Sequence, residues 1–170
     1  MDCIQKLTSI YGLGLCCGLW SKEEVIQWCD KVIEVSDSPP YEIIEISLMS
    51  KEKIDDIEGK LFEFSRIVDE EYAVKLTLSV IHEKLVRNEL MIEESIKSTT
   101  RLLVNRGLYW EDEYRDLYSV DDSYELAKNG DHFDLVEVVN IYIEMLGFYG
   151  KYFSEFENLY FKVMENKWGR

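Results

Sequence analysis

Apolar residues recur at three- and four-residue steps along most of this chain, which is the spacing of amphipathic helices. Short breaks rich in Gly, Pro, Ser or Asn separate the periodic stretches, and no alternating strand-helix-strand pattern is present. The pattern predicts an all-α fold, a multi-helix bundle of about seven or eight helices. The expected helices carry their apolar positions within residues 3–17, 21–35, 41–49, 54–68, 69–87, 91–106, 131–147 and 153–164.

The boundary between the first two helices has the clearest local signals. Gly18 suits the left-handed position just after a helix end, with Leu19 and Trp20 folding back as its apolar contact. Ser21 and Glu24 then have the S-x-x-E spacing of a capping box, in which each side chain binds a backbone N–H of the other residue. These residues predict one helix stop followed at once by a new helix start.

Three stretches have a less definite pattern. Residues 41–49 fit either a short helix or a strand, because their apolar positions match both periods, and we favour a helix. Residues 111–125 are either a helix or an ordered loop. The stretches 131–147 and 153–164 are so densely apolar that we expect them to form the central hairpin of the bundle.

A length of 170 residues fits one domain, so we expect residues 1–170 to form a single helical domain. The formal net charge is −15. Nucleic acids and anionic membranes are bound through Lys and Arg that neutralise phosphates, so neither is an expected partner. The charge favours a basic protein partner, and homo-oligomerisation stays open.

The four cysteines show neither the paired spacing of a zinc site nor a disulfide framework, and they resemble small buried apolar groups. The apolar N-terminal stretch lacks a basic beginning and a small-residue cleavage site, so we interpret it as mature protein. No stretch reaches the roughly 18 apolar residues of a membrane span. Together these features predict a reduced, cytoplasmic location.

The most unusual stretch, residues 107–125, interleaves carboxylates with large aromatic residues. Such a combination suits a surface that docks a cationic partner, with the acids steering and pairing and the aromatics as anchors. The ordinary alternative is a solvated acidic helix whose tyrosines pack inward. The candidate partner-binding residues are Tyr109, Trp110, Glu111, Asp112, Glu113, Tyr114, Asp116, Tyr118, Asp121 and Asp122.

Catalytic and cofactor motifs are missing from the sequence. There are only two histidines, His82 and His132, and neither lies in a zinc-protease or di-metal helix pattern. Phosphate-binding glycine loops, EF-hand loops and the GxSxG turn are absent too. We therefore expect no enzyme activity, no catalytic residue, no metal site and no cofactor. A small enzyme with a carboxylate-lined pocket containing His82 is the least favoured alternative.

Residues 18–48, GLWSKEEVIQWCDKVIEVSDSPPYEIIEISL, resemble the opening of small acidic helical proteins from bacteria, some of them similar to immunity proteins that neutralise secreted toxins. The resemblance implies a single-domain cytoplasmic protein that protects its maker by occluding a toxin, and it transfers no binding residue. A helical adaptor that acts through homo-oligomerisation is the competing interpretation. The resemblance depends on Gly18, Ser21, Glu23, Glu24, Trp28, Asp30, Pro40 and Tyr41.

Overall fold

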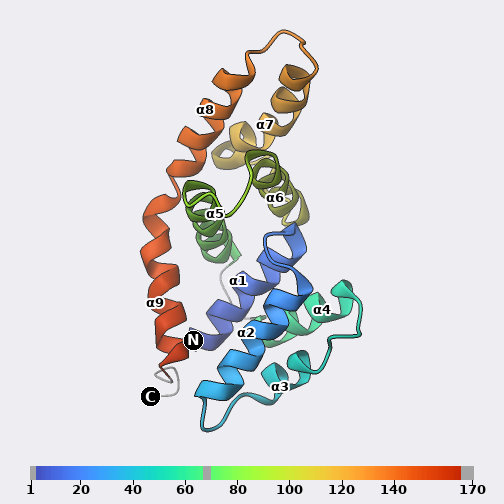
Figure 1. The fold of residues 1–170 in the computed structure, drawn as a ribbon, viewed down its shortest axis with the longest axis vertical. Coiled ribbons are helices and arrows are strands. Elements are labelled where there is room, and N and C mark those ends of the chain that lie inside the picture. The colour runs from blue at the N-terminus through green and yellow to red at the C-terminus, as the bar shows by residue number, and fades with distance from the viewer. Residues whose placement is uncertain (1–2, 67–69, 166–170) are drawn as a thin grey trace. The chain divides into compact units, whose positions relative to one another are not determined.

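The computed structural model describes residues 3–66 and 70–165 (Figure 1). These residues form nine α-helices and one short 3-10 helix, and none of them lies in a strand. The all-α prediction is confirmed. The helix ends expected at Val68 and Asp69 lie outside the described residues.

The chain divides into two compact units. The first unit comprises residues 1–74 and 154–170, and the second comprises residues 75–153. The single domain expected for residues 1–170 stays a prediction.

The first unit is built on α1 (Cys3–Cys17), α2 (Lys22–Val35), α3 (Tyr41–Ser47) and α4 (Ile54–Ser65). It also includes the start of α5 (Glu70–Val86) and nearly all of α9 (Phe153–Met164). Helix α1 packs against α4, and α2 packs against α3. Since α1 is apolar on almost every side, it lies in the core, and its buried Thr8 hydroxyl donates to the Ile4 carbonyl at 2.7 Å.

Both signals at the boundary between α1 and α2 are confirmed. Gly18 has a φ of 79°, and the amide of the next residue, Leu19, donates to the Gly14 carbonyl at 2.8 Å. Leu19 and Trp20 are buried, as the folded-back contact requires. The Glu24 amide donates to the Ser21 hydroxyl at 3.2 Å, and the Ser21 amide donates to the Glu24 carboxylate at 2.7 Å. The capping box therefore fixes the start of α2.

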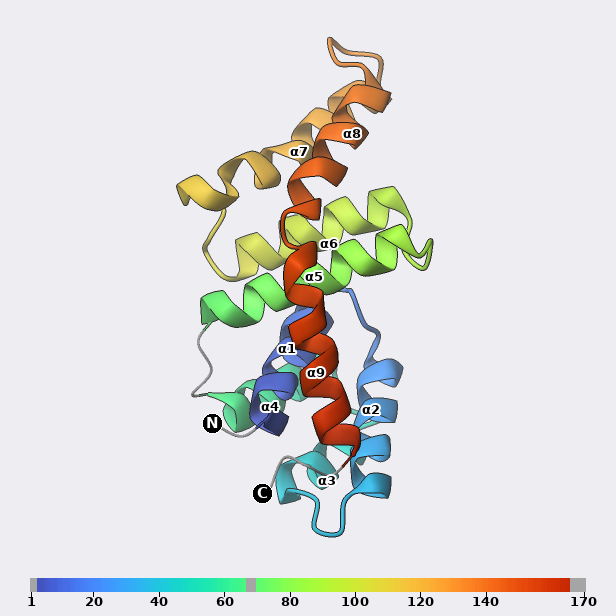
Figure 2. The same cartoon turned by 90° about the vertical axis from the view of Figure 1, so that its left-hand side faces the viewer.

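The second unit contains the rest of α5, then α6 (Ile92–Asn105), α7 (Asp112–Lys128), α8 (Leu135–Gly147) and the 3-10 helix η1 (Gly150–Tyr152). Figures 1 and 2 both show α7 and α8 side by side as an antiparallel pair. Gly130, with a φ of 81°, follows the end of α7, and Asp134 caps α8 by accepting from the Val136 and Glu137 amides.

Two of the three less definite stretches are helices. Residues 41–47 form α3, which confirms the helix over the strand, and the acidic stretch forms α7 from Asp112 onward. The third expectation is wrong, because α8 and α9 are not the central hairpin. Helix α8 packs on α7 within the second unit, while α9 beyond Phe153 belongs to the first. High apolar content was mistaken for burial, since Val136, Ile141 and Ile143 of α8 are exposed.

The described residues contain four free cysteines, of which Cys17 and Cys29 are buried and Cys3 and Cys16 are partly exposed. The expected character of small buried groups is thus confirmed for Cys17 and Cys29. Among the helices of residues 3–66 and 70–165, none combines the length and the apolar character that crossing a membrane requires.

Candidate functional site

The aromatic residues before and within α7 have different exposures. Trp110 is 65% exposed and Tyr109 is 41% exposed, and both precede the first turn of the helix. Tyr118 is half-buried, with its ring centroid 5.3 Å from that of Tyr109. These three side chains are on the surface, as expected for anchors.

Tyr114 is the exception and corrects the prediction. It is 1% exposed, and its ring stacks at 6.2 Å on that of Tyr149. The reason is helical periodicity, because Tyr114 shares the buried face of α7 with Leu117, Val120 and Tyr124. Tyr114 is a core residue and cannot contact a partner in the folded protein.

The acids of this stretch do not share one face. At about 100° per residue, Asp116 and Asp122 lie roughly 120° apart around α7. Glu111, Asp112, Glu113, Asp116 and Asp122 are exposed, and Asp121 is partly buried. The Asp112 carboxylate already accepts from the Arg115 guanidinium at 2.6 Å. The candidate residues therefore separate into two flanks of the helix.

Asp121 is on the flank of α7 that faces α6, whereas the next residue, Asp122, is exposed. Burial raises the pKa of the Asp121 carboxyl, and Asp122 and Glu125 raise it further, while the Thr100 hydroxyl and Lys97 act in the opposite direction. This flank carries a carboxylate that its surroundings make costly to ionise.

The other flank borders a groove between α7 and α8. We call it the α7/α8 groove, and its volume is about 240 Å³. One wall is acidic and the other apolar, and Phe148 in the apolar wall is 63% exposed. The residues that line the groove are Glu113, Asp116, Leu117, Met145, Phe148 and Tyr149.

The two acids of the groove differ in their partners. The Glu113 carboxylate is 3.5 Å from the Lys75 ammonium and accepts from the Tyr149 hydroxyl at 3.5 Å. Burial and Glu113 both raise the pKa of the Tyr149 phenol, so this hydroxyl stays a donor. The Asp116 carboxylate, in contrast, forms no ion pair with any residue that the structure describes. Asp116 is the acid that remains open to a partner.

The apolar wall already contacts a cationic side chain of the same unit. The Lys151 ammonium lies 4.2 Å from the centre of the Phe148 ring, which is a cation-π contact. Met145, Phe148 and Tyr149 were not among the predicted site residues, because their stretch was interpreted as core. The only signal in the sequence is the position of Phe148 and Tyr149 between Gly147 and Gly150, where a helix is expected to end.

Neither histidine lines this groove. The His82 ring instead lies against Gly147, the last residue of α8, and Gly150 of η1, so close that a Cβ on Gly150 would be 2.9 Å from its Nδ1. Within residues 3–66 and 70–165, no three His, Cys, Asp or Glu side chains are placed to hold a metal ion together. The groove thus brings the exposed Asp116 carboxylate and the exposed Phe148 ring into one lining.

Comparisons of this chain with protein-family models, with curated proteins and with solved structures give no match. The likeness of residues 18–48 to immunity-type proteins therefore stays a prediction.

Proposed function

We propose that this chain is a non-enzymatic protein-binding module that docks a basic protein partner on the α7/α8 groove. The observation that carries the proposal is the exposed Asp116 carboxylate, which has no ion pair among the described residues, beside the exposed Phe148 ring. A partner Arg inserted there would pair with the carboxylate and stack on the ring, and Arg is suited to both contacts.

The charge of the whole chain also supports docking of a basic partner. A formal net charge of −15 attracts a basic surface over several ångströms and accelerates its association. Trp110 and Tyr109 are exposed on the segment that leads into α7 and add aromatic contact area of the kind that dominates interfaces. Steering comes from the total charge, whereas specificity comes from the groove.

The biological role that fits best is that of an immunity protein in the bacterial cytoplasm, which neutralises a basic toxin domain by occluding it. The resemblance of residues 18–48 and the acidic groove support this role independently, because the first unit carries the resemblance and the second carries the groove. Occlusion needs no catalytic group on the inhibitor.

The test uses the product of the neighbouring reading frame, if that product ends in a basic domain. Binding is measured by calorimetry at increasing salt, and we expect affinity to fall steeply as salt screens the charges. Asp116→Lys should weaken binding at least about tenfold, since it replaces an attraction by a repulsion. Asp122→Lys is the matched control, with the same change of charge on the flank away from the groove, and should weaken binding much less. Equal losses for the two variants would refute the groove as the docking site.

A second candidate function, homo-oligomerisation, is supported by exposed apolar residues on α8. Val136 and Ile143 are both exposed and lie seven residues apart, so they share one side of the helix. A second copy of the chain could cover this apolar side, which would make the protein a homo-oligomeric adaptor. Sedimentation of the purified protein, with the double variant Val136→Lys and Ile143→Lys, tests this. A monomer at micromolar concentration would eliminate the adaptor.

A further inference from the structure

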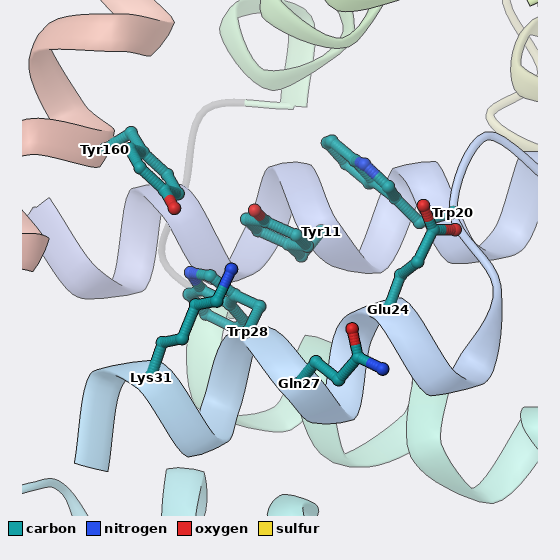
Figure 3. A pocket seen from close by; sticks show the side chains of 7 residues that line it. All are labelled: Tyr11, Trp20, Glu24, Gln27, Trp28, Lys31 and Tyr160. Atoms are coloured by element: carbon teal, nitrogen blue, oxygen red, sulfur yellow. The ribbon is translucent and has the colours of Figure 1, made fainter. Parts of the chain in front are cut away.

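The first unit contains a second cavity, which we call the aromatic pocket. Its volume is about 200 Å³, and Figure 3 shows that α1, α2 and α9 all contribute side chains to it. Four of the seven lining residues are aromatic and three are polar side chains on one face of α2. The lining residues are Tyr11, Trp20, Glu24, Gln27, Trp28, Lys31 and Tyr160.

A stack of three rings forms the back of the pocket. The Tyr11 ring lies between two indoles, 4.3 Å from that of Trp20 and 4.2 Å from that of Trp28, with interplanar angles of 20° and 12°. Both faces of the Tyr11 ring are covered, one by each indole (Figure 3). Close packing on both sides of Tyr11 makes this wall rigid.

One polar atom in this wall is left without a partner. The Trp28 side chain is 3% exposed, and its indole N–H is buried and makes no hydrogen bond within the described chain. A buried donor without a partner is costly, and most buried polar groups in native structures are hydrogen-bonded. Figure 3 shows the indole nitrogen at the end of the pocket where Lys31 and Tyr160 also lie.

The neighbours of this N–H are also donors. The Lys31 ammonium forms no ion pair with a described carboxylate, and the Tyr160 hydroxyl has no hydrogen bond in the same part of the chain. The one acid of the pocket, Glu24, is engaged by the Ser21 amide in the capping box. Seven residues of helix separate Glu24 from Lys31, which is about 10 Å, close to one Debye length in dilute salt. The Trp28 end of the pocket is thus a local donor site in an acidic protein.

We propose that the aromatic pocket binds a small monocarboxylate, whose oxygens accept from the Trp28 indole N–H and the Lys31 ammonium. Charge-assisted hydrogen bonds to a carboxylate are stronger than those to a neutral carbonyl, so an acid is favoured over its amide. The volume equals that of roughly seven water molecules, which is enough for a molecule about the size of benzoate. The aromatic side chains that line the pocket offer ring contacts to a flat body.

The experiment uses the full chain, labelled with nitrogen-15, and follows the indole N–H signals during titration with benzoate. Trp28→Phe keeps an aromatic ring in the stack and identifies the Trp28 signal by its loss. We expect benzoate to cause a saturable downfield shift of that signal. We expect the affinity for benzamide to be at least roughly tenfold lower than the affinity for benzoate. Lys31→Gln should weaken benzoate binding several-fold, while Lys51→Gln, the same change of charge at an exposed position elsewhere in the first unit, should not.

Three outcomes would overturn the proposal. The first is a Trp28 signal that does not move at millimolar benzoate. The second is an equal response to benzamide, which would remove the need for a carboxylate. The third is an equal effect of Lys31→Gln and Lys51→Gln, which would indicate only a change in total charge. Since Lys31 is exposed, its variant tests the site even if Trp28→Phe lowers stability. None of these results bears on the α7/α8 groove of the second unit.

Discussion

Gly14 is the position where the smallest substitution should have the largest effect. It lies inside α1, where alanine is normally preferred over glycine. Here, however, a Cβ at position 14 would be 2.0 Å from Cε3 and 2.3 Å from Cζ3 of Trp20. Carbon atoms in contact need about 3.5 Å, so Gly14→Ala must displace the Trp20 indole by roughly 1.5 Å. The indole is rigid and buried, so it cannot rotate out of the way at low cost.

The magnitude follows from what Trp20 touches. Its ring stacks on Tyr11 at 4.3 Å and lies 6.3 Å from Phe156, and such pairs contribute about 0.5–1.5 kcal/mol each beyond their buried area. Overpacking a core adds about 1–3 kcal/mol of strain. Against this, alanine gains about 1 kcal/mol of helix propensity over glycine. We expect Gly14→Ala to lower the free energy of unfolding by about 1–5 kcal/mol, the upper end applying if both ring contacts are lost.

The assay is urea unfolding followed by tryptophan fluorescence and far-UV circular dichroism. Gly59→Ala is the matched control, because Gly59 is inside α4 and a Cβ there meets no atom within 4 Å. It should raise the free energy of unfolding by about 0.5–1 kcal/mol, the ordinary gain for this change in a helix. If Gly14→Ala is as stable as the wild type while Gly59→Ala shows its gain, the reasoning about the Trp20 contact is refuted.

Three further predictions concern single buried or partly buried groups. Burial raises the pKa of the Cys29 thiol to about 12, so Cys29 should stay unmodified by thiol reagents in the native protein and react only after unfolding, as peptide mapping would show. Tyr142→Phe should destabilise the protein by about 1–3 kcal/mol in urea unfolding, because the Tyr142 hydroxyl lies 2.7 Å from the Ser95 and 2.9 Å from the Thr99 hydroxyl in a buried network. The raised pKa of Asp121 means that the folded state holds its proton more tightly than the unfolded chain does, so this carboxyl lowers stability as the pH rises above its ordinary value of 3.8. Asp121→Asn should therefore raise the melting temperature at neutral pH and not in acid, and a lower melting temperature at neutral pH would contradict this.

Local signals in the sequence predicted local structure well. The Gly18 stop and the Ser21–Glu24 capping box each depend on residues within a few positions of one another, so tertiary packing had little power to alter them. The helix favoured for residues 41–49 was confirmed over 41–47 for a related reason, since Pro40 immediately before α3 sets a backbone angle that suits a helix start.

The site was harder to predict, because exposure depends on which helix faces meet. Tyr114 was predicted to be exposed because acidic residues surround it in the sequence. Its spacing from Leu117 and Val120, however, places it on the buried face of α7. Phe148 was overlooked for the opposite reason, because an apolar stretch predicts burial and not which of its residues stay outside. Composition singled out residues 107–125, and the packing of α7 on α8 determines that, of their acids, Glu113 and Asp116 line the groove.

The two proposed sites require ligands of opposite charge, and this makes each a control for the other. The total charge acts at long range on both, so removing any exposed acid should weaken binding of a basic protein and strengthen binding of benzoate. A contact acts only at its own site. Asp116→Lys should therefore reduce affinity for the basic partner far more than it raises affinity for benzoate, and Lys31→Gln should reduce affinity for benzoate while changing the basic partner's affinity slightly. If both variants shift the two affinities in opposite directions by similar factors, the −15 charge of the chain accounts for the binding and neither pocket is specific.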